Sequence, residues 1–177
     1  LNQLNLVPTF GFPGSDNMLG SENGQGSVSL TPIGRLSVIR ASEVENYLEK
    51  VKEYEAAQRN SPQTLDGRLW MKNTLHVTGA TDALLSVTLC NYMQNYRLML
   101  EDTLTGQNIT VLCKSVEGAE SPASAGVVQS LFQEGLSLLT YFGHSSANTL
   151  EFSIENPEAY NNPGKYPVMS VNGCYAG

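Results

Sequence analysis

Two reactive side chains follow apolar runs in the last third of the chain. Residues 136–142 lead to His144 and residues 168–171 lead to Cys174, and a glycine precedes each reactive residue. An imidazole beside a thiol can hold it as the thiolate, the nucleophile of acyl transfer, and can later protonate the departing amine. The two positions therefore predict a Cys/His dyad.

The two apolar runs must place these side chains together. Short continuous apolar runs bounded by turn residues are typical of strands buried on both faces of a parallel sheet. In open α/β sheets the ligand site lies just outside the carboxyl ends of the strands. If the two strands are parallel neighbours, His144 and Cys174 emerge at the same sheet edge.

The preceding chain alternates between strand and helix patterns. We expect a strand at residues 75–77, a helix at 81–101 and a strand at 109–113. A helix then begins at Ser121-Pro122, an N-cap followed by proline at the first helical position, and ends at Gly135. This order predicts a mostly parallel sheet with right-handed crossovers and helices on both faces.

Two motifs in this region resemble one peptidase family. They are YFGH at residues 141–144 and SVNGCYAG at residues 170–177, with PIGRL at residues 32–36 upstream. Together they resemble the gingipain-type cysteine peptidases, peptidase family C25, from about Phe10 to the chain end. The resemblance implies an α/β, caspase-like three-layer sandwich. Residues 1–31 would be an irregular connector or the tail of a preceding subdomain, and residues 32–177 a catalytic subdomain truncated at its C-terminal side.

The resemblance also implies roles for individual residues. His144 would be the general acid/base and Cys174 the nucleophile, with an oxyanion hole formed by the backbone N–H groups of Ser145 and Cys174. Many relatives have glycine at the position of Ser145. On the long loop after His144, either Glu151 or Glu155 could orient the imidazole, and the sequence does not choose between them.

The function implied is that of a cysteine endopeptidase. It would cut polypeptides through a thioester acyl-enzyme, without a required cofactor, and would act on or mature secreted proteins at or outside a bacterial cell surface. The alternative is a non-catalytic caspase-like module in surface assembly or binding, motivated by Ser145 and by the chain end at Gly177. A flavodoxin-like binding or receiver domain is a weaker option, because residues 79–82 make too thin a phosphate loop.

Composition excludes several other classes. Of the 177 residues 41% are apolar and 15% are charged, which is typical of a globular domain. The net charge of −7, without a basic stripe, argues against nucleic acid or an anionic membrane as partner. We find neither a membrane-spanning run nor a signal peptide at Leu1. We expect a fragment, or one chain of a cleaved enzyme, that associates with a missing C-terminal part or a preceding subdomain.

Three further features have a structural interpretation. Asp16 and Glu22, in a glycine-rich segment, could hold a structural calcium ion, but their spacing favours ordinary turn chemistry. His76 lies within a strand pattern and is expected to be a packed or edge residue rather than a catalytic base. Cys90 and Cys113 are predicted to be buried small hydrophobes rather than a disulfide.

The clearest helical pattern begins at Ser42. Ser42 and Glu45 fit a capping box, and the helix is expected to continue to about Arg59. Apolar side chains recur along it at helical spacing and predict one buried face. They are Val44, Tyr47, Leu48, Val51 and Tyr54.

Overall fold

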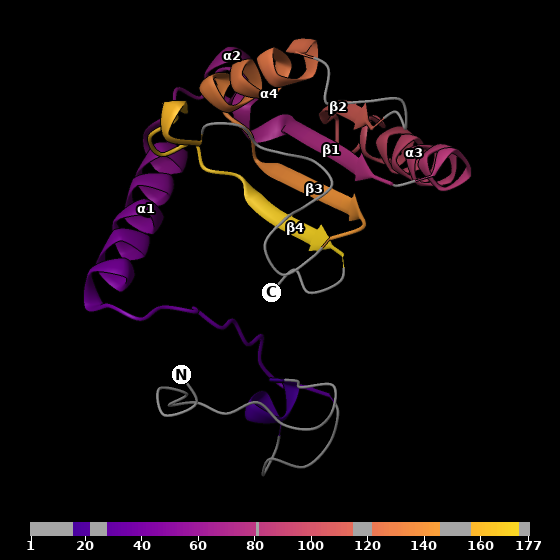
Figure 1. The fold of residues 1–177 in the computed structure, drawn as a ribbon. Helices are drawn as coiled ribbons and strands as arrows, with labels where there is room; N and C mark the ends of the chain where they lie inside the picture. Colours follow the sequence, from indigo (N-terminus) through magenta and orange to yellow (C-terminus); the bar gives the residue numbers. More distant parts are fainter. Residues whose placement is uncertain (1–15, 22–27, 81, 115–121, 146–156, 174–177) are drawn as a thin grey trace. The chain divides into compact units, whose positions relative to one another are not determined.

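The computed structural model of the protein describes residues 16–21, 28–80, 82–114, 122–145 and 157–173 (Figure 1). The chain divides into two compact units, Leu1–Tyr47 and Leu48–Gly177. The first unit holds a short 3-10 helix, η2 (Asn17–Gly20). The second unit holds the sheet and both predicted strand ends, so the candidate site belongs to it.

The described residues of the second unit form a four-stranded sheet in which every pairing is parallel. The strands are β1 (Asn73–Gly79), β2 (Asn108–Cys113), β3 (Leu138–Gly143) and β4 (Val168–Asn172), arranged in the order β2-β1-β3-β4. Figure 1 shows their arrowheads pointing the same way. The predicted parallel sheet is confirmed, and β3 and β4 are neighbours in it.

One face of the sheet carries the apolar core. Helix α4 (Pro122–Glu134) lies over this face, and its Val128 and Phe132 pack against inward side chains of β1 and β3. Burial of this kind contributes roughly 25 cal/mol per Å² of apolar surface. The buried members contributed by the strands and the turn before β3 are Leu75, Val77, Leu136, Leu139 and Tyr141.

After η5 (Pro157–Ala159), the chain returns on this same side of the sheet. The ring of Tyr160 stacks on Phe132 of α4, with ring centroids 4.4 Å apart and nearly parallel planes. The connection from β3 to β4 is thus held, in its described part, against the α4 layer.

Helix α3 (Ala83–Leu100) lies on the opposite face and packs chiefly on β1 and β2. The carboxylate of Asp82 caps it by accepting a hydrogen bond from the backbone N–H of Leu85 at 2.8 Å. The sheet is therefore covered by helices on both faces, as predicted. The crossover from β1 to β2 and the crossover from β2 to β3 run in opposite directions across the sheet. Because both are right-handed, α3 and α4 lie on opposite faces.

A disulfide joins α3 to the end of β2. Cys90 and Cys113 are bonded, with their Cα atoms 5.6 Å apart. The prediction that both are buried thiols is wrong. Cys90 on α3 lies next to Cys113 at the exposed end of β2, and the two side chains are bonded. Cys113 is exposed and Cys90 half-buried.

The long helix α1 (Ala41–Asn60) corrects two details of the predicted capping and burial. It begins one residue earlier than expected, so Glu43 and not Glu45 caps it. One carboxylate oxygen of Glu43 accepts from the backbone N–H groups of Ile39 at 2.7 Å and Arg40 at 2.9 Å. This is one half of a capping box, a carboxylate at the third helical position that accepts from the backbone before the helix, because Arg40 has no side-chain oxygen to supply the other half.

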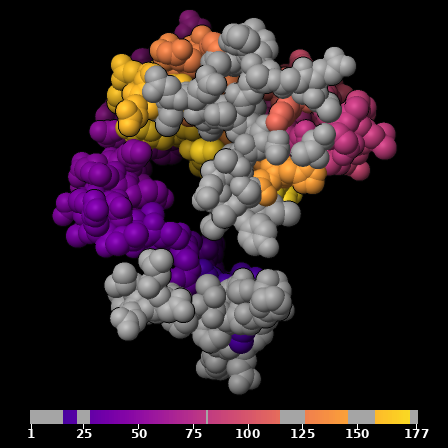
Figure 2. Space-filling model, in the orientation of Figure 1, coloured from indigo at the N-terminus to yellow at the C-terminus, as the bar shows by residue number. Residues whose placement is uncertain are grey.

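No residue of α1 is buried. Figure 2 shows its side chains, in purple, at the surface. The predicted buried face is wrong for its first half, where Val44, Tyr47 and Leu48 are between 42% and 54% exposed. The second half is held by Tyr54, whose ring meets that of Trp70 edge to face at 5.9 Å. Trp70 lies in η4 (Leu69–Lys72), which follows the short helix α2 (Leu65–Arg68).

Candidate active site

The backbone of His144 is fixed on two sides directly after β3. Its N–H donates to the carbonyl oxygen of Gly79 at 3.1 Å, which continues the β1–β3 ladder by one residue. Its carbonyl oxygen accepts a hydrogen bond from the hydroxyl of Tyr141, a side chain that is 1% exposed in the core. The imidazole itself is exposed. A reactive side chain at the surface is thereby carried on a backbone anchored in the core.

The register of β3 and β4 sets the relation between the two predicted catalytic positions. Phe142 pairs with Asn172, and each reactive residue stands two positions further along its own strand's sequence. Cys174 lies outside the described residues. The two strands are parallel neighbours, which is the condition that the predicted dyad requires, while contact between thiol and imidazole stays a prediction.

Glycines permit a close approach of the strand ends at this edge. Gly79 and Gly143 are register partners, and a Cβ added to Gly143 would lie 2.6 Å from the nitrogen and 2.8 Å from the carbonyl carbon of Gly79. A Cβ on Gly173 would lie 3.0 Å from the carbonyl oxygen of Gly143 and closer still to the hydroxyl of Ser145. Real Cβ atoms do not approach so closely, so a side chain at Gly143 would force the strands apart.

Sequence reasoning did not assign any role to Tyr141 or to the Gly79–Gly143 contact. The sequence does contain a signal for this contact. Gly79 and Gly143 each end a strand pattern, and a glycine in a strand often marks a close approach of another backbone. Tyr141 was hidden within a run that reads as uniformly apolar, although a buried tyrosine hydroxyl usually finds a partner. These residues support the site rather than take part in its chemistry.

The other predicted site residues are placed as follows. Ser145 directly follows His144 and forms a single-residue β-bridge, and a Cβ added to Gly173 would lie against its hydroxyl. Donation from its backbone N–H to an oxyanion stays a prediction. Glu151 and Glu155 lie outside the described residues, and the choice between them remains open.

The calcium candidates belong to the first unit. Arg35 binds the carboxylate of Asp16 through two nitrogens, Nε to Oδ2 at 2.8 Å and Nη2 to Oδ1 at 2.6 Å. The hydrogen bonds from Arg35 lower the pKa of Asp16. Glu22 lies outside the described residues. Within the described ranges, no group of three or more His, Cys, Asp or Glu side chains could hold a metal ion.

His76 is packed within the sheet, as predicted. It is 2% exposed in the middle of β1, and its Nδ1 lies 2.6 Å from the Thr140 hydroxyl of β3. Its Nε2 is buried without a hydrogen-bond partner. Burial lowers the pKa of His76, because a low-dielectric interior disfavours the charged ring.

The comparisons with known proteins identify the family. The family model of peptidase family C25 matches residues 2–177. The chain belongs to this family. Its four parallel strands with helices on both faces are an α/β caspase-like sandwich. No curated protein and no solved structure matches the chain.

Membership of family C25 makes the chain part of a cysteine peptidase. Among the helices described for this C25 chain, none combines the length and the apolar character that a membrane span requires.

Proposed function

We propose that the protein is an endopeptidase that works through a His144–Cys174 dyad. The observation that carries the proposal is the parallel pairing of β3 with β4, in the register Phe142 to Asn172. Parallel neighbours deliver the residues that follow them to one sheet edge. A thiol and an imidazole at such an edge are the groups that peptide hydrolysis by acyl transfer requires.

The reaction divides into acylation and deacylation. The Cys174 thiolate attacks the carbonyl carbon of the peptide, and backbone N–H groups, including that of Ser145, stabilise the oxyanion. The C–N bond breaks, the sulfur–carbon bond of a thioester remains, and the departing amine takes a proton from His144. A water molecule then gives a proton to His144 and its oxygen attacks the thioester; the C–S bond breaks, the acid is released, and the Cys174 thiolate is restored beside the protonated imidazole.

We also propose that the polypeptide acts outside the cytoplasm, on or in the maturation of secreted proteins at a bacterial surface. The disulfide Cys90–Cys113 supports this location. Disulfides persist in oxidising compartments and are rare where thioredoxin and glutathione keep thiols reduced. An acidic, polypeptide-directed enzyme in that setting has no need of a cofactor for the chemistry described.

The proposal is tested by comparing variants of the natural polypeptide that contains this chain. Cys174→Ala and His144→Ala should each lower the rate of cleavage of an unfolded protein substrate at least a hundredfold. Val168→Ala, which changes a side chain that is 62% exposed at the start of β4, is the matched control and should cleave like the wild type. Unchanged cleavage in Cys174→Ala would contradict the proposal and favour a non-catalytic binding module.

A further inference from the structure

The side chains of β3 alternate between the two faces of the sheet. Leu139 and Tyr141 belong to the core that α4 covers. Phe142 therefore projects to the other face, where its ring meets that of Tyr92 on α3, with ring centroids 6.5 Å apart and planes inclined by 44°. This contact joins the flank of α3 to the end of β3, beyond the two strands on which the helix chiefly packs.

The imidazole of His144 is expected on the same face as Phe142. The backbone N–H of His144 donates to Gly79 and continues the β1–β3 ladder, so the chain is still extended at this residue. Along an extended strand, residues two apart project from the same face, about 6.6 Å apart. Phe142 therefore contacts Tyr92 and is also the neighbour of the imidazole along this face of β3.

Two links hold the part of α3 that precedes Tyr92. The hydroxyl of Ser86 donates to the carbonyl oxygen of Lys114 at 2.5 Å, and Cys90 is bonded to Cys113. Cys113 ends β2 and Lys114 follows it. This part of the helix is thus fixed at the carboxyl edge of the sheet, where the candidate site lies.

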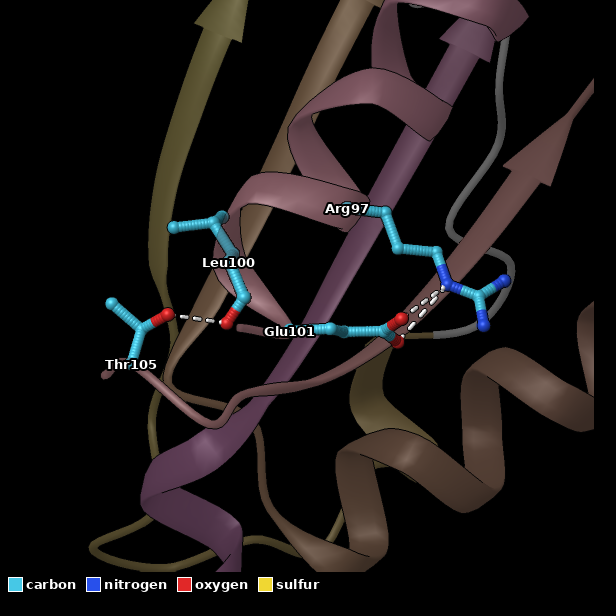
Figure 3. Close-up of polar contacts among 4 residues, drawn as sticks. All are labelled: Arg97, Leu100, Glu101 and Thr105. Atoms are coloured by element: carbon cyan, nitrogen blue, oxygen red, sulfur yellow. Dashed lines mark hydrogen bonds and ion pairs between the residues drawn. The ribbon is translucent and has the colours of Figure 1, made fainter. Parts of the chain in front are cut away.

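The end of α3 after Tyr92 is closed by polar contacts of its own (Figure 3). The hydroxyl of Thr105 donates to the carbonyl oxygen of Leu100 at 2.6 Å. Glu101 accepts from Nε of Arg97 at 2.9 and 3.0 Å. The ring of Tyr92 therefore projects from a helix that is held on both sides of it, and a side chain on a rigid element can keep its neighbour in place.

The exposure of Tyr92 separates a role in the site from a role in the core. Its side chain is 50% exposed, whereas the adjacent Met93 is 4% exposed and supplies the core contact of this turn. Truncation of Tyr92 would therefore remove little buried surface. An effect of that truncation on the reactive groups can be measured in a protein that still folds.

We propose that Tyr92 is a positioning residue of the active site, whose ring supports Phe142 and thereby fixes the His144 imidazole relative to Cys174. The inference rests on the proposed function and adds to it a residue that acts through Phe142 and not on the substrate. Beyond their burial, aromatic pairs of this kind are worth a factor of roughly two to ten in an equilibrium. Loss of the ring should reduce the population of the reactive thiolate–imidazolium pair by about that factor, because a contact can shift an equilibrium only by its own worth.

The test compares the rate of Cys174 alkylation by iodoacetamide at two pH values, measured by mass spectrometry on the natural polypeptide. At about pH 6, well below the ordinary thiol pKa of about 8.5, rapid reaction requires an imidazolium that holds the thiolate. Tyr92→Ala should lower the rate there by about two- to tenfold. At about pH 10 an ordinary thiol is ionised without help, and the variant should react like the wild type. An equal loss at both pH values, or no loss at either, would overturn the inference.

Two further variants locate the effect in the ring of Tyr92. Tyr92→Phe keeps the ring and loses only the hydroxyl, so it should react like the wild type at about pH 6. Tyr96→Ala is the matched control, because Tyr96 is also 50% exposed and lies one helical turn further along α3, away from the carboxyl end of β1. It should react like the wild type at both pH values. A Tyr92→Phe rate as low as that of Tyr92→Ala, or an equal loss in Tyr96→Ala, would contradict the assignment.

The wild type and His144→Ala separate failure of this inference from failure of the dyad. If Cys174 reacts rapidly at about pH 6 and this depends on His144, but Tyr92→Ala reacts like the wild type, only the role of Tyr92 is wrong. If wild-type Cys174 reacts as an ordinary thiol, the proposed function fails and the role of Tyr92 fails with it.

Discussion

At the residue scale, the edge of the sheet depends on small backbone contacts rather than on the reactive groups alone. Gly143 faces Gly79 at a separation that excludes any side chain, and the hydroxyl of Tyr141 holds the carbonyl of His144. A dyad needs its two groups at hydrogen-bonding distance, so small backbone displacements here would change reactivity. The supporting residues can therefore be tested separately from the chemistry.

Gly143→Ala should destabilise the protein by about 1–3 kcal/mol, because the added methyl would overlap the backbone of Gly79. Gly126→Ala in helix α4 is the matched control, since a Cβ added there would meet no atom within 4 Å outside its own helical backbone. There the substitution should stabilise by roughly 0.5–1 kcal/mol. Urea unfolding measures both, and equal stabilities for the two variants would show that the Gly79 contact is not tight.

Tyr141→Phe should cost about 0.5–1.5 kcal/mol of stability, because it removes the partly buried hydrogen bond to the carbonyl of His144 and leaves the ring in place. It should also slow alkylation of Cys174 if the clamp on His144 positions the imidazole. Urea unfolding and the alkylation rate are measured on the same sample. A loss of stability with an unchanged alkylation rate would make Tyr141 a packing residue only.

His76 should make stability depend on pH. Burial lowers its folded-state pKa below the ordinary value of 6.5, so between those two pKa values the unfolded chain binds more protons. Stability is therefore complete above pH 6.5 and falls as pH decreases toward the folded-state pKa. His76→Gln should flatten this part of the profile from urea unfolding at several pH values. An identical slope in wild type and variant would contradict a buried neutral ring.

At the element scale, the patterns that can be recognised from sequence are those set by local chemistry. The apolar runs before His144 and Cys174 are β3 and β4, and the Pro122 start and Gly135 stop of α4 are observed, with Gly135 at a φ of 103°. These signals act within a few residues. The first helical turn of α1 differs from the prediction because Ser42 is a good N-cap residue by type, whereas the helix begins one residue before it and is capped by Glu43 without a Ser or Thr at the N-cap.

Contacts between elements are harder to predict from the sequence. Cys90 and Cys113 lie 23 positions apart in a helix and a strand, each in an apolar setting, so their pairing depends on how α3 crosses β2. The first half of α1 was expected to be buried from its periodicity, yet periodicity does not reveal whether a partner surface is present. The disulfide and the exposure of the first half of α1 are both seen only in the tertiary structure.

The disulfide should contribute substantially to the stability of the α3–β2 layer. Cys90→Ser with Cys113→Ser should lower the free energy of unfolding by about 2–4 kcal/mol, because the unfolded chain loses a cross-link around 23 residues. Cys174→Ser controls for loss of a thiol that is not in this bond. Urea unfolding with and without a reductant measures the effect, and a reductant should not affect the double variant. Unaltered stability on reduction would contradict the prediction.

At the scale of the whole molecule, the parallel sheet explains where the candidate site lies. Strand order β2-β1-β3-β4 brings the last two strands together at the edge where a thiol and an imidazole follow. The alternation of elements predicted the sheet, but strand order depends on long-range pairing that no local pattern contains.

The central claim is that His144 activates Cys174, and the rate of Cys174 alkylation by iodoacetamide as a function of pH tests it most directly. The bonded Cys90 and Cys113 should stay unlabelled, which makes the signal specific. We predict rapid alkylation of Cys174 well below the ordinary thiol pKa of about 8.5, and loss of this advantage in His144→Ala. An ordinary thiol titration, identical with and without His144, would contradict the account.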